Sequence, residues 1–159
     1  VLEALTAPTR IALMTAIGVT KPTVGHDWKR RGERLVRASG LAYTIVRPGW
    51  FDYNEAYELR LVMLQGDTRW AGDASDGVIS RKQIAEVLVG SLGSTAANRK
   101  TLELVADEGA AQPELAPLFA ALQEDPAGSI DGVLDRDTRP LADEPSRVVS
   151  ELDAIRGRY

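Results

Sequence analysis

Several side chains that could bind or transform a ligand gather directly after a short β-branched run at residues 43–46. They form an aromatic group: Trp50, Phe51, Tyr53 and Tyr57. In open α/β sheets ligands bind in the crevice beyond the carboxyl ends of the strands, which is where this group would lie. The group is therefore a candidate pocket wall, and the alternative is a hydrophobic plug that closes the top of the core.

Other kinds of chemistry are limited by what the sequence lacks. His26 is the one histidine and there is no cysteine, which excludes disulfides, a thiolate metal site and a cysteine nucleophile and leaves too few ligands for zinc. No G-x-S-x-G elbow is present, and a lone histidine beside a helix start is more often a capping or surface group than a base. The aspartates Asp67, Asp73 and Asp76 lack the ligand order of an EF-hand, so a solvated loop is favoured.

Length and charge limit which classes of protein are possible. The 159 residues suffice for about one domain, and the formal charge of −4 provides no overall positive field for nucleic acid or an anionic membrane. No stretch approaches the ~20 apolar residues of a membrane span, and the lack of cysteine fits a reducing cytoplasm. The chain begins at Val1 without methionine, as if a helix were already under way, so we expect a fragment.

Hydrophobic patterning predicts alternating strands and helices. Strands are expected at residues 10–15, 43–46 and 101–105, and helices at 27–39, 81–92, 114–123 and 145–155. Residues 59–64 are either a strand or a short helix. The continuous apolar run at 10–15 indicates a strand buried on both faces, as in a parallel sheet. These elements predict an α/β fold with a peripheral helical C-terminal tail.

The first helix carries a row of cations: Lys29, Arg30, Arg31, Arg34 and Arg37. Glu33 stands four residues from Lys29 and from Arg37 and can pair with either within the helix. A nucleic-acid surface is one interpretation, but the net negative charge and the lack of interleaved aromatic residues argue against it. A solvated helix face, or a subunit interface that meets the acidic C-terminal segment in a homo-oligomer, is the alternative.

Four segments, in order, resemble a known family. They are I-A-L-M-T-A-I-G at 11–18, the stretch from K-x-x-x-E at 29–33 to S-G-L at 39–41, Y-T-I-V-R-P-G at 43–49, and G-V-I-S leading into Q-I-A at 77–85. Together they resemble the C-terminal half of an atypical short-chain dehydrogenase/reductase, the NAD(P)H-binding Rossmann group that includes NmrA-like proteins. The resemblance covers about residues 1–106.

The resemblance implies a doubly wound, parallel-sheet Rossmann-like fold of which this chain supplies the later half. It places the C-terminal half of a NAD(P)-binding domain at 1–107 and a helical extension packed on the same domain at 108–159. The implied cofactor is NAD or NADP. In the family the glycine-rich turn that receives the pyrophosphate lies in the first half, so these residues alone would not complete the cofactor site.

The resemblance also implies roles for individual residues. Thr15 and Lys29 match catalytic positions: the hydroxyl orients a substrate carbonyl, and the lysine binds the nicotinamide ribose. Cofactor contacts are implied for Thr15, Ala16, Lys29, Pro48, Gly49 and Trp50, and substrate contacts for Trp50, Phe51 and Tyr53. The family's tyrosine would stand four residues before the lysine, where this chain has Gly25, and glycine cannot donate a proton.

Two functions are consistent with these residues. The first is a NAD(P)-dependent oxidoreductase acting on an unknown small molecule in the cytoplasm, with no nucleic-acid or membrane partner. The second is a non-catalytic NAD(P)-binding protein that senses redox state or regulates a partner, as NmrA-like relatives suggest. Gly25 at the tyrosine position favours the second function.

Overall fold

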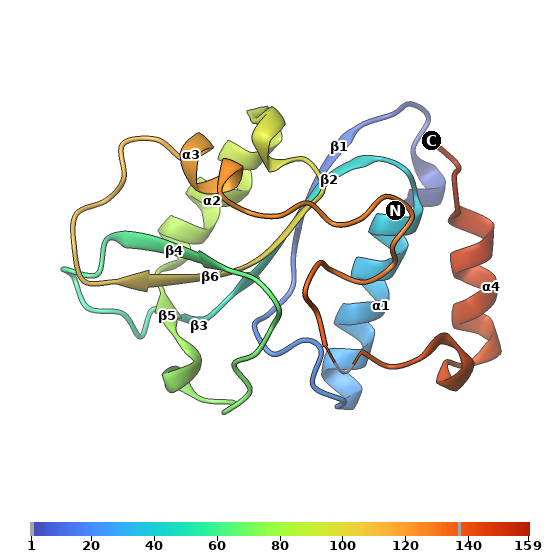
Figure 1. Ribbon diagram of the computed structural model, residues 1–159, viewed down its shortest axis with the longest axis horizontal. Helices are drawn as coiled ribbons and strands as arrows, with labels where there is room; N and C mark the ends of the chain where they lie inside the picture. The colour runs from blue at the N-terminus through green and yellow to red at the C-terminus, as the bar shows by residue number, and fades with distance from the viewer. Residues whose placement is uncertain (1, 137) are drawn as a thin grey trace.

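A single sheet with helices on both faces forms the body of the protein (Figure 1). The computed structural model describes residues 2–136 and 138–159, so Val1 of the expected N-terminal helix end lies outside the described residues. The strands are β1 (Arg10–Met14), β2 (Ala42–Pro48), β3 (Trp50–Phe51), β4 (Arg60–Leu64), β5 (Val78–Ile79) and β6 (Lys100–Asp107). The α-helices are α1 (Val24–Ala38), α2 (Arg81–Gly93), α3 (Ala116–Ala120) and α4 (Ser146–Ile155).

The sheet is mixed, with a mostly parallel centre. Strands β1, β2 and β6 lie side by side and parallel, and β3 pairs in parallel with β5. Strands β4 and β5 run antiparallel to β6. The fold is α/β with a mostly parallel sheet between helices, as predicted, but the antiparallel pairings of β4 and β5 with β6 make the sheet mixed and not wholly parallel.

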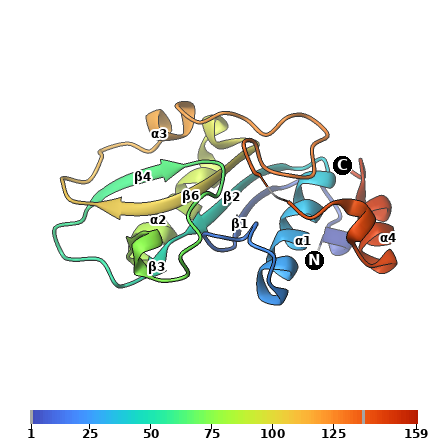
Figure 2. The same ribbon diagram turned by 60° about the horizontal axis from the view of Figure 1, so that its bottom comes forward.

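The strand buried on both faces is β2 and not, as the apolar run at 10–15 predicted, β1, which lies at the edge of the sheet and is only half-buried. Ile45 packs with Val36 of α1 on one face, whereas Val46 packs with Ile84 and Val87 of α2 on the other. Because successive side chains of a strand point to opposite faces, α1 and α2 cover opposite sides of the sheet. Figure 2 shows the two helices separated in this way.

Helix α1 starts earlier than the predicted residue 27, which corrects the interpretation of Asp27 as its cap. The helix begins at Val24 and not after Asp27, because the Thr23 hydroxyl accepts a hydrogen bond from the His26 backbone N–H at 3.4 Å. The Asp27 carboxylate instead accepts hydrogen bonds from Arg30 and Arg139. The first turn therefore contains residues that the sequence assigned to a loop.

Helix α2 begins as predicted. Ser80 and Gln83 form a reciprocal capping box, in which each side chain accepts a hydrogen bond from the other's backbone N–H. The predicted helix at 114–123 shortens to α3, and α4 matches the predicted helix at 145–155. None of the helices in the described ranges is long and apolar enough to cross a membrane.

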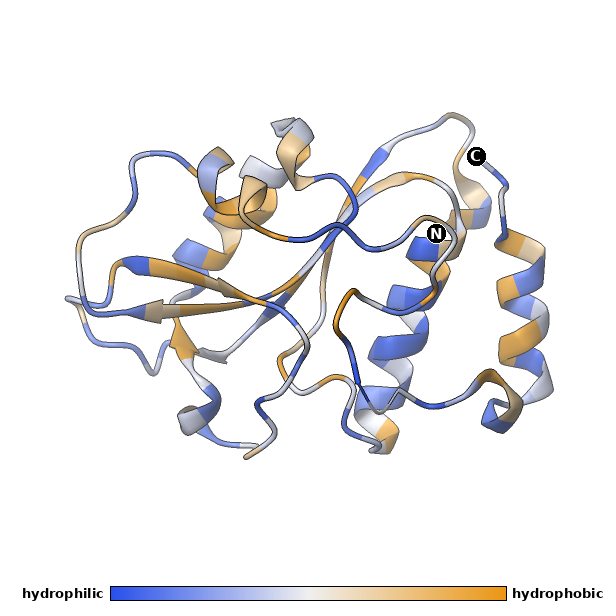
Figure 3. Ribbon diagram, viewed as in Figure 1, coloured by the Kyte–Doolittle hydropathy of each residue, from blue (hydrophilic) through white to orange (hydrophobic). Residues whose placement is uncertain are grey.

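The basic face of α1 is buried, which corrects the prediction of a solvated face. Arg30 and Arg34 are only 2% and 1% exposed, and together with Arg31 they donate to the Glu144 carboxylate of the C-terminal segment. Figure 3 shows α1 as a largely hydrophilic helix lying between the sheet and α4. The acidic tail of the same chain therefore covers this face, where the sequence left open a partner subunit.

A buried carboxylate, Glu33, joins α1 to both neighbouring strands. It accepts hydrogen bonds from the Thr15 hydroxyl at 2.6 Å and from Arg47 of β2 at 2.6 and 3.0 Å. It pairs with Arg37 at 3.1 Å, and no pairing with the expected Lys29 is present among the described contacts. Burial alone would raise the pKa of Glu33, but Arg47 and Arg37 outweigh it and lower the pKa to about 2.

Replacing Glu33 tests how much this carboxylate stabilises the fold. We expect Glu33→Gln to lower the free energy of unfolding by about 3–5 kcal/mol, because it leaves buried arginines without their counter-charge. Glu86→Gln is the matched control, since Glu86 is exposed and pairs only loosely with Lys82 at 3.9 Å, which predicts a loss below about 1 kcal/mol. Urea denaturation measures both, and equal losses would contradict the assignment.

Candidate functional site

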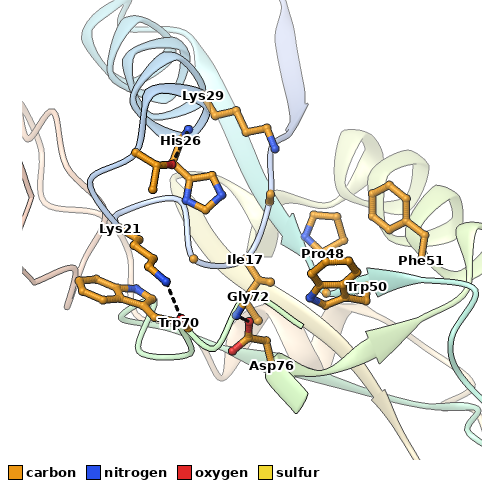
Figure 4. Close-up of a pocket in the computed structure, with 14 residues that line it drawn as sticks. Ile17, Lys21, His26, Lys29, Pro48, Trp50, Phe51, Trp70, Gly72 and Asp76 are labelled. Carbon is orange, nitrogen blue, oxygen red and sulfur yellow. Dashed lines mark hydrogen bonds between the residues drawn. The ribbon is translucent and has the colours of Figure 1, made fainter. Parts of the chain in front are cut away.

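A cleft of about 520 Å³ opens at the carboxyl ends of β1 and β2 (Figure 4). The loop after β1 contributes Ala16, Ile17, Gly18, Lys21 and Thr23, and α1 contributes His26 and Lys29. The opposite wall consists of Pro48, Gly49, Trp50 and Phe51, and a third side consists of Trp70, Gly72 and Asp76. Three chain segments that lie apart in the sequence, residues 16–29, 48–51 and 70–76, therefore meet at one edge of the sheet.

The loop after β1 is held in place by backbone and carboxylate contacts. The Ile17 N–H donates to the Pro48 carbonyl at 3.0 Å, which extends the parallel pairing past the end of β1. The buried Asp67 carboxylate accepts hydrogen bonds from Gly18 N–H and Thr20 N–H, both at 2.7 Å. Since its backbone is fixed in this way, the loop presents a preformed wall to the cleft.

Gly49 connects β2 to β3 at the floor of the cleft. A Cβ at this position would lie 2.4 Å from the Gly77 carbonyl oxygen, so only glycine allows the close approach. The Trp50 N–H then donates to the same carbonyl at 2.9 Å, and the chain continues beside β5. The turn brings Trp50 and Phe51 to the cleft instead of ending the sheet.

Six of the predicted site residues line this one cleft. They are Ala16, Lys29, Pro48, Gly49, Trp50 and Phe51. Two others do not line it. The Thr15 hydroxyl is turned toward α1 and donates to Glu33, and Tyr53 is 66% exposed and packs edge-on against the Trp50 ring.

The placement of Thr15 follows from strand alternation. Its side chain points to the same face as Leu13, which packs in the cluster beneath α1. The nearby Glu33 carboxylate then provides a strong acceptor for the hydroxyl at 2.6 Å. In this structure the hydroxyl that the resemblance assigned to a substrate carbonyl takes part in the buried network instead.

Sequence reasoning missed several residues of the cleft. Trp70 lies in a stretch read only as a loop, and an isolated tryptophan among glycines and aspartates was the available signal. His26, expected as a capping or surface group, is half-buried and lines the cleft. Asp76, expected in a solvated loop, is 4% exposed and accepts hydrogen bonds from Ala71 N–H and Gly72 N–H at 2.8 and 2.7 Å.

Two polar atoms in the cleft residues lack partners. His26 Nδ1 and Trp70 Nε1 are both closed off from solvent, and neither makes a hydrogen bond within residues 2–136 and 138–159. Such orphaned polar atoms are uncommon in folded proteins and call for an explanation. The cleft also has aromatic walls and the Lys29 ammonium, which has no ion pair to any described residue. The aromatic walls and the ammonium fit a flat ring bearing a hydroxylated group, as in a nicotinamide riboside; the two enclosed nitrogens do not reach the open cleft.

A second buried carboxylate, Glu103 of β6, lies behind the cleft loop. Burial raises the pKa of Glu103 to about 7. The positive charge of Arg47 opposes this rise, but its guanidinium lies 3.6 Å from the carboxylate, too far for a hydrogen bond. The negative charges of Asp135 and of Asp67, which holds the cleft loop, also raise the pKa of Glu103, and its Oε1 has no hydrogen-bond partner among the described residues. Ionisation at Glu103 therefore adds an unfavourable buried charge to the folded state.

The raised pKa of Glu103 predicts a pH dependence of stability. The folded state binds the proton more tightly than the unfolded state, so this stabilisation is full at low pH and is lost as pH rises toward about 7. We expect a loss of roughly 3 kcal/mol between pH 4.5 and 8, which Glu103→Gln removes. Glu114→Gln, at an exposed position, should keep the wild-type slope. Urea denaturation across this range measures it, and an unchanged slope in Glu103→Gln would contradict the prediction.

Comparison with known proteins identifies the family. A family model described as NAD(P)H-binding matches residues 5–95. An uncharacterized chloroplastic protein of Arabidopsis thaliana is 35% identical over 95 residues, which are 60% of this chain and 32% of that protein. The chain thus spans about a third of the length of this curated relative. The chain belongs to the NAD(P)H-binding family, in agreement with its resemblance to atypical short-chain dehydrogenases/reductases.

A solved structure gives a weaker likeness. It is a chain from Bacillus halodurans described as "Putative NAD-dependent epimerase/dehydratase", with 20% sequence identity and a TM-score of 0.48. The overlap covers 72% of this chain and 52% of that one. We base the family assignment on the sequence match.

Proposed function

We propose that the cleft binds the nicotinamide end of NAD or NADP and that the chain is part of an oxidoreductase acting on a small molecule. The observation that carries this proposal is the meeting of Ala16, Lys29 and Trp50 in one cleft at the carboxyl edge of parallel strands. This edge is where α/β sheets bind their ligands. A nicotinamide cofactor, when bound, would supply or accept a hydride.

Each wall has a distinct part in this proposal. Lys29 donates to the ribose hydroxyls, because its ammonium extends from the first turns of α1 into the cleft (Figure 4). Pro48 and Gly49 form a flat floor under the ring, and Trp50 and Phe51 exclude water from the substrate end. Thr15 is a positioning residue, since its hydroxyl supports Glu33 and thereby the helix that carries Lys29.

A non-catalytic NAD(P)-binding sensor is the second candidate, and Gly25 favours it. A Cβ at Gly25 would meet no heavy atom within 4 Å among its described surroundings, so the tyrosine expected there is replaced by open space. A sensor would bind the cofactor without turnover. Its preference for NAD or NADP, its small-molecule partners and a cytoplasmic location stay predictions for either candidate.

Lys29 provides the direct test of cofactor binding. We expect Lys29→Met to weaken NADPH or NADH binding by about 10- to 100-fold, the loss of a charge-assisted hydrogen bond. Lys82→Met is the matched control, because the Lys82 side chain is 85% exposed on α2, and it should bind as the wild type does. Isothermal titration calorimetry on the full chain measures both affinities.

Two results separate the candidates. Loss of nicotinamide absorbance with a carbonyl or quinone acceptor would support the oxidoreductase. Tight binding without turnover would support the sensor. Equal affinities in wild type and Lys29→Met, or no binding of either cofactor, would contradict the proposed site.

A further inference from the structure

Reduction of a carbonyl group needs a proton as well as a hydride. The carbon receives the hydride and the oxygen receives the proton, so a proton donor must line the cleft. Gly25 has no side chain and is exposed. The donor must therefore be another proton-bearing side chain that lines the cleft.

Most of the polar side chains of the cleft are occupied by structural hydrogen bonds. Lys21 Nζ donates to the Trp70 carbonyl at 3.0 Å, and the Thr23 hydroxyl caps α1. Both oxygens of Asp76 accept backbone N–H groups. Among the described lining residues, this leaves Lys29 and the imidazole of His26 as titratable, proton-bearing groups that make no side-chain hydrogen bond to the protein.

The imidazole of His26 is half-buried at the wall of the cleft. It lies against the bare backbone of Gly18, where a Cβ would stand 3.8 Å from its Cε1. Its Nδ1 is closed off from solvent, so the other ring nitrogen, Nε2, is the one that a ligand in the cleft can reach. His26 and Lys29 are three residues apart and therefore share one face of α1, and Figure 4 shows both side chains extending from that helix at the cleft.

We propose that His26 is the proton donor of this site, an inference that rests on the proposed oxidoreductase function. A bound reduced nicotinamide would supply the hydride that forms the C–H bond while the C=O π bond breaks. The oxygen, which keeps the electron pair of that bond, would take the proton on Nε2 of the His26 imidazolium, which gives the alcohol and a neutral imidazole. The imidazole would then regain its proton from water. The charged groups that line the cleft with it are Lys21, Lys29 and Asp76.

Turnover of the full chain with NADPH and a panel of aldehydes, ketones and quinones tests the assignment. We expect His26→Gln to lower the rate with the best acceptor by at least about 100-fold while the NADPH affinity changes less than about threefold. Val24→Gln, on an exposed residue of the same turn, is the matched control and should keep the wild-type rate. Adding Gly25→Tyr to His26→Gln should restore part of the rate, because open space surrounds Gly25.

A spectroscopic readout is available because His26 is the one histidine of the sequence. Nitrogen NMR of the imidazole reports on this residue alone. With NADP⁺ and the best acceptor, a pair that cannot react, we expect the ring nitrogen resonances to shift from their positions with NADP⁺ alone, since the carbonyl oxygen then accepts a hydrogen bond. A histidine with only a structural role would keep its resonances.

The outcomes separate the two levels of the proposal. Wild-type protein that binds neither NADPH nor NADH would overturn the proposed site, and binding without turnover of any acceptor would overturn the oxidoreductase function in favour of the sensor. Turnover that is unchanged in His26→Gln, or unshifted imidazole resonances in protein that turns over an acceptor, would overturn the assignment of His26 alone.

Discussion

The buried Glu33 carboxylate is the contact on which the arrangement of the cleft depends. It takes hydrogen bonds from β1 through Thr15 and from β2 through Arg47, so it fixes α1 against the carboxyl-end half of both strands. His26 and Lys29 lie seven and four residues earlier on the same helix face. Because the contacts of Glu33 fix how α1 is rotated against the sheet, these two side chains face the cleft.

Anchoring a charge at this depth requires compensation from the rest of the chain. Arg47 donates to Asp135 as well as to Glu33, at 2.7 Å to each oxygen, and Arg37 pairs with Asp125 at 3.2 Å. Both aspartates belong to the segment between α3 and α4. Because buried arginines need counter-charges, this irregular segment is needed to neutralise Arg37 of α1 and Arg47 of β2.

The same logic explains why the C-terminal segment covers α1. Glu144 alone accepts hydrogen bonds from three arginines of that helix, and Figure 1 shows α4 beside α1. The helix that looked basic and solvated is therefore an internal element of the protein. Its charge is neutralised within the chain, which removes the basis for a nucleic-acid surface on these arginines.

Sequence reasoning recovered the order of strands and helices because apolar runs and caps are local signals. Ser80 marked the start of α2, and the residues after β1 and β2 were correctly brought to one cleft. The failures came from non-local charge pairing. Whether Glu33 meets Lys29 or Arg47 depends on contacts across the sheet, which local spacing does not encode. Strand alternation turns Thr15 toward α1, but the acceptor that its hydroxyl finds there, Glu33, is again a contact between distant segments.

The position of Trp70 shows the same limit. The loop that carries it folds over the cleft because Asp67 and Asp76 capture backbone N–H groups, and the sequence offered only acidic residues near glycines. The sequence indicates that these aspartates are solvated or bind a cation, whereas in the structure they are buried hydrogen-bond acceptors. The position of this side of the cleft therefore depends on loop contacts that are seen only in the folded chain.

Amide chemical-shift mapping with NADPH tests the central claim most directly. If the cleft receives the nicotinamide end, the largest shifts should fall at residues 16–18, at Lys29, at residues 49–51 and at residues 70–72. Shifts confined to the groove between α1 and α4, around Leu35 and Ile155, would contradict the account, as would the absence of any shift at the cleft.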